Sequence, residues 1–145
     1  MKRNIQYIVV HCTATPPDTK IESIQRYWKE QLGWKNPGYH YIIKRNGEIV
    51  TINEEENISN GVKGYNKNAI HISYIGGIDK NNNPFDNRTD AQKHAMFNKL
   101  VALSEKYPGA TLLGHRDFPA VTKLCPSFDV KEWLKNYTPN LDLAA

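Results

Sequence analysis

Two short apolar runs at opposite ends of the chain each lead to a histidine. The first, Ile5 to Val10, is rich in β-branched residues and directly precedes His11. The second, residues 110–113, precedes Gly114 and His115. Short apolar runs of this kind are typical of buried strands. We therefore expect a sheet that buries both runs and carries a histidine at the end of each.

Helix and turn signals divide the rest of the chain. Three helices are predicted, opened by Thr19, Thr89 and Asp129, since each of these residues can accept a hydrogen bond from the first turn. Asn46-Gly47 predicts a β-hairpin. The further predicted strands cover residues 39–44, 48–52, 69–74 and 111–113. The resulting order, β-α-ββ-β-α-β-α, predicts an α/β fold with a central mixed sheet and helices packed against it.

The length and charge of the chain limit its class. At 145 residues it is expected to be one domain. We place that domain at residues 1–138 and a C-terminal tail at 139–145. A net charge of +4 and a pI near 9.0 suit polyanionic surroundings, either nucleic acid or an anionic cell envelope. The alternative is that the charge only keeps the protein soluble. The sequence has no basic stripe or reader motif, so we expect no nucleic-acid partner.

The N-terminal residues favour a protein that is cytoplasmic when synthesised. Met1-Lys2-Arg3 resembles the start of a signal peptide, but Gln6 interrupts the apolar run that follows, and no cleavage site follows it. No apolar run approaches the roughly 20 residues that span a bilayer. We therefore expect neither a signal peptide nor membrane insertion.

A zinc site is the chemistry that these residues suggest first. Two histidines, His11 and His115, and a cysteine, Cys125, suit a site with three protein ligands and a fourth position open to water. Other readings remain open at this point. His11 could be a hydrogen-bonded core histidine, Cys125 an inert buried thiol, and Cys12 and Cys125 could form a disulfide.

Six motifs resemble, in order, the type 2 N-acetylmuramoyl-L-alanine amidase family, which includes small phage amidases and the peptidoglycan recognition proteins. Together they extend from about residue 5 to residue 135, and the phage branch is the more similar. The motifs cover residues 10–15 (Val-His-Cys-Thr-Ala-Thr), 38–43 (Gly-Tyr-His-Tyr-Ile-Ile), 63–66 (Lys-Gly-Tyr-Asn), 76–79 (Gly-Gly-Ile-Asp), 114–117 (Gly-His-Arg-Asp) and 123–129 (Lys-Leu-Cys-Pro-Ser-Phe-Asp).

The resemblance implies a peptidoglycan-recognition fold with one Zn²⁺ in a groove on one face. His11, His115 and Cys125 match the family's zinc ligands. Tyr39 and Lys123 match two further residues that amide cleavage needs in the phage branch. Such a zinc ion would polarise the amide carbonyl and lower the pKa of its water towards ~7. Lys123 would stabilise the developing oxyanion, and Tyr39 or the zinc-bound hydroxide would be the general base.

The resemblance also suggests a substrate groove. Its predicted lining residues are Trp34, Lys63, Asn66 and Asn68. Relatives often carry a histidine in the loop before residues 63–66, and Gly61 stands near that place here, so we do not expect the substrate contact that such a histidine would make. Three further histidines match no ligand position and are expected to be packing or surface residues: His40, His71 and His94. We expect Asp117 to fix its loop by accepting hydrogen bonds.

The function implied is hydrolysis of the amide between the lactyl group of muramic acid and L-alanine in peptidoglycan. A phage or prophage endolysin, released to the cell wall by a membrane-opening partner, is the first expectation. A cytosolic enzyme that recycles muropeptides is the alternative, and a monomer is expected in both cases. Two other classes are weighed against these, namely a non-catalytic peptidoglycan-binding module and a cysteine–histidine hydrolase that uses Cys12 or Cys125.

Overall fold

Five strands form one mixed sheet in a computed structural model that describes residues 3–137. The strand order is β3-β2-β4-β1-β5, in which β3 runs antiparallel to β2 and the other neighbours are parallel. The predicted tail at 139–145 lies outside the described residues. The strands are β1 (Tyr7–Cys12), β2 (Tyr41–Ile43), β3 (Ile49–Thr51), β4 (Ala69–Tyr74) and β5 (Thr111–Gly114).

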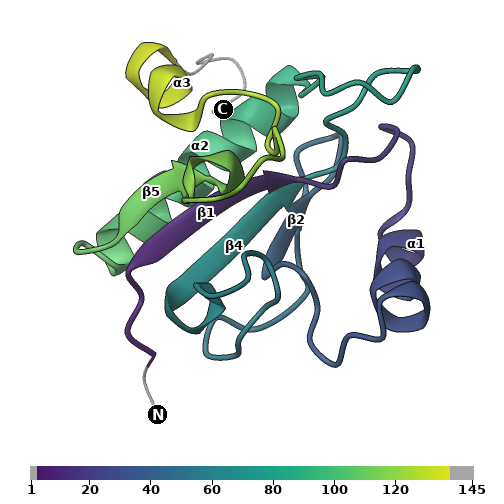
Figure 1. Cartoon of the computed structure of the whole chain (residues 1–145). Coiled ribbons are helices and arrows are strands. Elements are labelled where there is room, and N and C mark those ends of the chain that lie inside the picture. The colour runs from purple at the N-terminus through teal and green to yellow at the C-terminus, as the bar shows by residue number, and fades with distance from the viewer. Residues whose placement is uncertain (1–2, 138–145) are drawn as a thin grey trace.

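Strand β1 lies between two parallel neighbours, β4 and β5 (Figure 1). Parallel strands are covered on both faces, so they are apolar along most of their length. This is why β1 contains Ile8, Val9 and Val10, all fully buried. The strand extends further than predicted, to Cys12, so His11 is part of it and its side chain projects from one face of the sheet.

Helices cover both faces of the sheet (Figure 1). Helices α2 (Asp90–Lys106) and α3 (Val130–Asn136) pack on one face. Helix α1 (Ile21–Arg26), which continues as a π-helical turn over Tyr27–Gln31, packs on the other. The prediction of a single α/β domain with a mixed sheet between helices is confirmed. Within residues 3–137, no helix has both the length and the apolar character that a membrane span requires.

The larger core lies between the sheet and α2. Met96, Leu100 and Leu103 of α2 are at most 2% exposed and pack against strand residues such as Ile70 and Ile72. Their spacing in the sequence predicts one apolar helical face, and their burial confirms it. Two of the three predicted helix caps are also confirmed. Thr89 accepts a hydrogen bond from the Gln92 N–H, and Asp129 accepts one from the Glu132 N–H.

The first helix differs from its prediction in two ways. It begins at Ile21, and its N-cap residue Lys20 makes no side-chain cap, so the predicted capping box at Thr19 is wrong. The Thr19 N–H instead donates to the Pro16 carbonyl in a turn. The spacing of Ile21, Ile24, Trp28 and Leu32 predicts one apolar face for this helix. Trp28 is buried on that face, but Leu32 is 42% exposed. The Leu32 N–H bonds to the Tyr27 carbonyl, five residues back, and this wider turn moves Leu32 off the apolar face.

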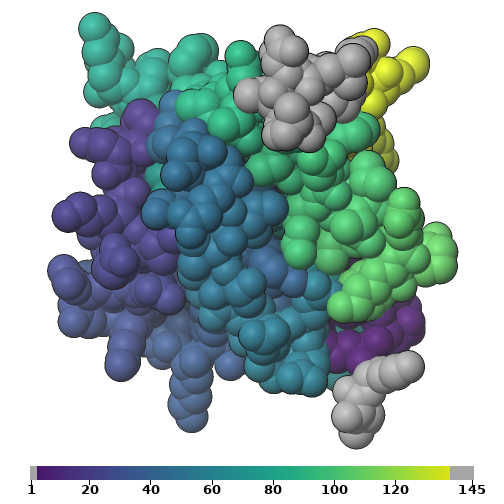
Figure 2. All heavy atoms as spheres, turned by 180° about the vertical axis from the view of Figure 1, so that it is seen from behind, coloured from purple at the N-terminus to yellow at the C-terminus, as the bar shows by residue number. Residues whose placement is uncertain are grey.

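The loop that follows β3 lies against the end of α2. Glu55 accepts a hydrogen bond from the Tyr107 hydroxyl (2.6 Å), forms an ion pair with Lys106 (3.0 Å) and accepts a further hydrogen bond from the Tyr41 hydroxyl. Seen from behind, the blue surface of this loop region adjoins the green surface of α2 (Figure 2). Glu55 therefore links this loop to β2 and to the C-terminal end of α2.

Adjacent residues of α2 test the packing directly. Leu100→Ala is expected to lower the free energy of unfolding by about 2–5 kcal/mol, because Leu100 is 1% exposed and the truncation leaves a cavity. Val101→Ala, at a position 41% exposed, should change it by less than about 0.5 kcal/mol. Urea unfolding of both variants measures the difference. Equal losses would contradict this description of the core.

Candidate metal centre

Three side chains that are far apart in the sequence meet at one end of the sheet. His11, His115 and Cys125 each bring one ligand atom into a group whose atoms all lie within 4.8 Å of one another. His11 Nδ1 is 3.9 Å from Cys125 Sγ. A tetrahedral zinc ion holds ligand atoms roughly 3.3–3.8 Å apart, given bonds of ~2.1 Å to nitrogen and ~2.3 Å to sulfur. The donor set therefore suits zinc, and the ligand atoms lie slightly further apart than a bound ion would hold them.

The register of the sheet places the two histidines side by side. Val10 of β1 lies opposite Gly114 of β5, and a histidine follows each of them in the chain. His115 begins a 3₁₀ turn (His115–Asp117), and the two imidazole rings are 4.9 Å apart between centroids. Asp117 accepts a hydrogen bond from the Gly114 N–H (2.8 Å), as predicted for this loop.

Backbone hydrogen bonds hold Cys125 beside the histidines. The Arg116 N–H donates to the Cys125 carbonyl (2.9 Å), and the Cys12 N–H donates to Cys125 Sγ (3.2 Å). Both cysteines are free, which contradicts the disulfide alternative. A hydrogen bond with Cys12 and burial raise the pKa of the Cys125 thiol well above its usual value. Without a metal it is therefore a poor nucleophile, and this argues against a cysteine–histidine hydrolase that uses Cys125.

Tyr39 lies against His11, with 5.0 Å between ring centroids. Its hydroxyl donates to the Cys12 carbonyl (3.1 Å), and its ring packs edge-on against Trp28. Burial, and then the nearby Cys125 and Cys12 thiols, raise the pKa of Tyr39. The phenol is therefore protonated at neutral pH and suited to donate a hydrogen bond. This geometry disfavours Tyr39 as the general base.

Lys123 is an exposed residue whose charge acts on the same group. The pKa values of His11 and His115 are both lowered, first by burial and also by the Lys123 ammonium. The positive charge is thus close enough to influence both imidazoles. Together with burial, it favours their neutral form, which is the form that binds a metal.

The sequence interpretation missed one residue of this site, His71. Its Nδ1 is 2.8 Å from His11 Nε2, and its Nε2 is 2.9 Å from Asn66 Oδ1. His71 is fully buried, which agrees with a packing residue, but it packs directly on a predicted ligand. Nothing in the sequence separates His71 from its neighbours in an apolar strand. Only the β1–β4 pairing brings it to His11.

The four predicted substrate residues occupy different environments. The Asn66 side chain is hydrogen-bonded to His71 within the protein, and the Asn68 side chain donates to the Asn4 carbonyl (2.8 Å). Trp34 is partly buried in the same apolar cluster as Tyr39, whereas Lys63 is exposed. Their contacts with substrate remain predictions.

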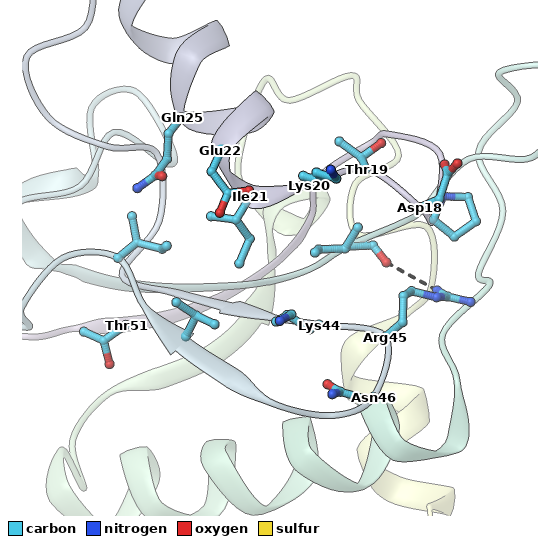
Figure 3. Close-up of a pocket in the computed structure, with 14 residues that line it drawn as sticks. Asp18, Thr19, Lys20, Ile21, Glu22, Gln25, Lys44, Arg45, Asn46 and Thr51 are labelled. Carbon is cyan, nitrogen blue, oxygen red and sulfur yellow. Dashed lines mark hydrogen bonds between the residues drawn. The ribbon is translucent and has the colours of Figure 1, made fainter.

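A separate groove of about 660 Å³ lies between the start of α1 and the β2–β3 hairpin (Figure 3). Polar side chains gather at its edges, including Lys20 and Glu22 on one side and Lys44 and Arg45 on the other. Arg45 donates to the Ile75 carbonyl (3.3 Å). None of the predicted site residues lines this groove, so it is separate from the histidine–cysteine group.

The buried histidines make stability depend on pH. Burial lowers the pKa of His40 from 6.5 to about 4, partly offset by its hydrogen bond to the Asn57 carbonyl. Since only the unfolded state gains this proton at mildly acidic pH, the contribution of His40 is present above pH 6.5 and is lost as the pH falls towards about 4. His40→Asn keeps an acceptor for the His71 N–H but does not titrate.

For the metal-free protein, the free energy of unfolding should therefore fall less steeply between pH 7 and pH 4 in His40→Asn than in the wild type. Urea unfolding at several pH values measures both slopes. Parallel slopes would contradict the assignment of His40 as a buried neutral group.

Comparison with known proteins agrees with this geometry. The family model described as "Amidase_2: N-acetylmuramoyl-L-alanine amidase" matches residues 1–128. The chain is 40% identical over 134 residues to an endolysin of Klebsiella phage KP32, covering 91% of this chain and 87% of that protein. It is also 40% identical over 127 residues to an endolysin of Escherichia phage T7, covering 87% and 83%.

A solved structure, the Ph2119 endolysin from a Thermus scotoductus bacteriophage, superimposes with a TM-score of 0.80 at 25% identity, covering 92% of this chain and 84% of that one. The expected fold is confirmed by this likeness. The family match spans most of the chain and includes His11, His115 and Cys125. The chain therefore belongs to the N-acetylmuramoyl-L-alanine amidase family.

Proposed function

We propose that this protein is a zinc-dependent amidase that hydrolyses the bond between the lactyl group of muramic acid and L-alanine in peptidoglycan. The observation that carries the proposal is the convergence of His11, His115 and Cys125 within 4.8 Å in a member of this family. Two histidines and one cysteine leave a fourth zinc position open, as catalytic sites require. One chain supplies all three ligands, so the proposed site needs no second subunit, in keeping with the expected monomer.

The surrounding side chains suit hydrolysis of an unactivated amide. Zinc, when bound, would supply a Lewis acid and lower the pKa of water towards ~7. Tyr39, held as a protonated phenol, would turn its hydroxyl from the Cys12 carbonyl and donate a hydrogen bond to the oxygen on which negative charge develops. Lys123 brings a positive charge to the same place. Both residues thus stabilise the transition state more than the neutral substrate.

We further propose that the protein acts on the cell wall as a phage endolysin. Two relatives at 40% identity, each matched over most of its length, are named endolysins. The basic pI of about 9.0 favours association with an anionic envelope. A recycling enzyme would instead prefer isolated muropeptides, so comparing activity on intact sacculi with activity on soluble fragments distinguishes the two roles.

Removal of the metal tests the amidase proposal. Purified protein should release L-alanine amino groups from peptidoglycan, lose this activity with a zinc chelator, and regain it when zinc is restored. Cys125→Ala should abolish zinc binding and activity, because it deletes a ligand. The matched variant Cys12→Ala should retain both. Full activity in Cys125→Ala, or activity that the chelator does not change, would contradict the proposal. Binding of peptidoglycan without release of amino groups would indicate a non-catalytic module.

The two side chains beside the ligands have a separate test. Tyr39→Phe and Lys123→Gln should each lower kcat by roughly 10²–10³, the usual loss for one oxyanion-stabilising group. Zinc content should stay at one ion per chain, since neither residue is a proposed ligand. Lys131→Gln, at an exposed position on α3, is the control for loss of a surface charge. Unchanged kcat in both site variants would remove them from the mechanism.

A further inference from the structure

A chain of hydrogen bonds runs inward from a surface loop to the proposed ligand His11. The backbone N–H groups of Gly61 and Val62 donate to Asn66 Oδ1, at 3.0 and 2.7 Å. The same oxygen lies 2.9 Å from His71 Nε2. At the other end, His71 Nδ1 lies 2.8 Å from His11 Nε2. Each member of the chain is thus in hydrogen-bond distance of the next.

The hydrogen bonds at the loop end determine which atom donates and which accepts in every other hydrogen bond of this chain. Two backbone N–H groups can donate only to an acceptor, so the Asn66 atom that they contact is the amide oxygen. His71 Nε2 must then carry a proton and donate to it. His71 is fully buried, and the hydrogen-bond partners of its ring include no carboxylate, so the imidazole is neutral with a lone pair on Nδ1.

That lone pair determines the tautomer of His11. To bond with it, His11 Nε2 must carry the proton and donate. The remaining nitrogen, Nδ1, then holds a lone pair and faces Cys125 Sγ at 3.9 Å. This is the protonation state that a metal ligand requires, and it is set by residues 50 or more positions away in the sequence.

The His71 ring is also held in position from both sides. A Cβ atom at Gly61 would lie only 2.3 Å from His71 Nδ1, so the ring packs directly on the Gly61 backbone. On the other side, His40 stacks on it with an interplanar angle of 10° and accepts a hydrogen bond from the His71 N–H (3.0 Å). The ring therefore has little freedom to rotate away from His11.

We propose that His71 and Asn66 form a positioning pair that holds His11 in its Nε2–H tautomer, with Nδ1 directed at the metal. The proposal rests on zinc binding by His11, His115 and Cys125, as proposed above. Asn66 thereby acquires an internal role in place of the predicted contact with substrate. Partners of this kind typically contribute 10- to 100-fold, roughly, to metal affinity.

Two substitutions of similar size separate this role from simple packing. In His71→Asn, the side-chain oxygen occupies the place of Nδ1 and can still accept from His11, whereas the equally branched His71→Leu cannot. The dissociation constant for zinc, measured by competition with a chromophoric chelator, should stay close to wild type in His71→Asn. It should rise by roughly 10- to 100-fold in His71→Leu. His94→Leu, on helix α2, is the control and should not change it.

Equal zinc affinity in His71→Asn and His71→Leu, whether high or low, would overturn the proposal. Because a substituted strand could fail to fold, the tautomers are also read in the wild type by two-bond ¹H–¹⁵N correlation spectra of ¹⁵N-histidine protein. We expect protons on Nε2 of both His71 and His11 with and without zinc, and a proton on His71 Nδ1 would contradict the proposal. If the wild type binds no zinc, the proposed function fails, whereas the tautomers of the metal-free protein still test the pair.

Discussion

The parallel pairing of β1 with both β4 and β5 is the constraint on which the site depends. Its register sets His11 next to the residue that follows Gly114, and brings His71 of β4 within hydrogen-bond distance on the same face. In open α/β sheets, ligand sites form beyond the carboxyl ends of parallel strands, because loops from neighbouring strands meet there. A one-residue slip of β1 would turn His11 into the α2 core and expose Cys12 in its place.

Because β1 is buried on both faces, few charged side chains are needed to keep the proposed metal-binding imidazoles neutral. Ile8, Val10 and Cys12 join the core under α2, while Val9 and His11 project towards the opposite face. Burial keeps the imidazoles of His11 and His71 neutral, and the Lys123 ammonium adds to the effect on His11. A neutral, hydrogen-bonded site of this kind is prepared for a cation, whose charge the Cys125 thiolate would partly balance.

Much of this arrangement can be predicted from the sequence, because it follows from local patterns. The strand over residues 69–74, the Thr89 and Asp129 caps and the apolar face of α2 each depend on neighbouring residues. The features that sequence reasoning missed depend on distant ones. The π-helical turn that exposes Leu32 has no local signal, and His71 resembles any strand residue until β4 pairs with β1. Likewise, the sequence shows at Gly61 only that the histidine of some relatives is absent. In the fold, the lack of a Cβ atom at Gly61 makes room for the His71 ring.

The central claim is that one zinc ion binds between His11 Nδ1, His115 and Cys125 Sγ. Anomalous diffraction at the zinc absorption edge, from crystals grown with zinc, tests it most directly. The account predicts one strong peak per chain, about 2.0–2.1 Å from His11 Nδ1 and from a nitrogen of His115, and about 2.3 Å from Cys125 Sγ. No peak among these atoms, coordination through His11 Nε2, or Cys12 in place of Cys125 would contradict it.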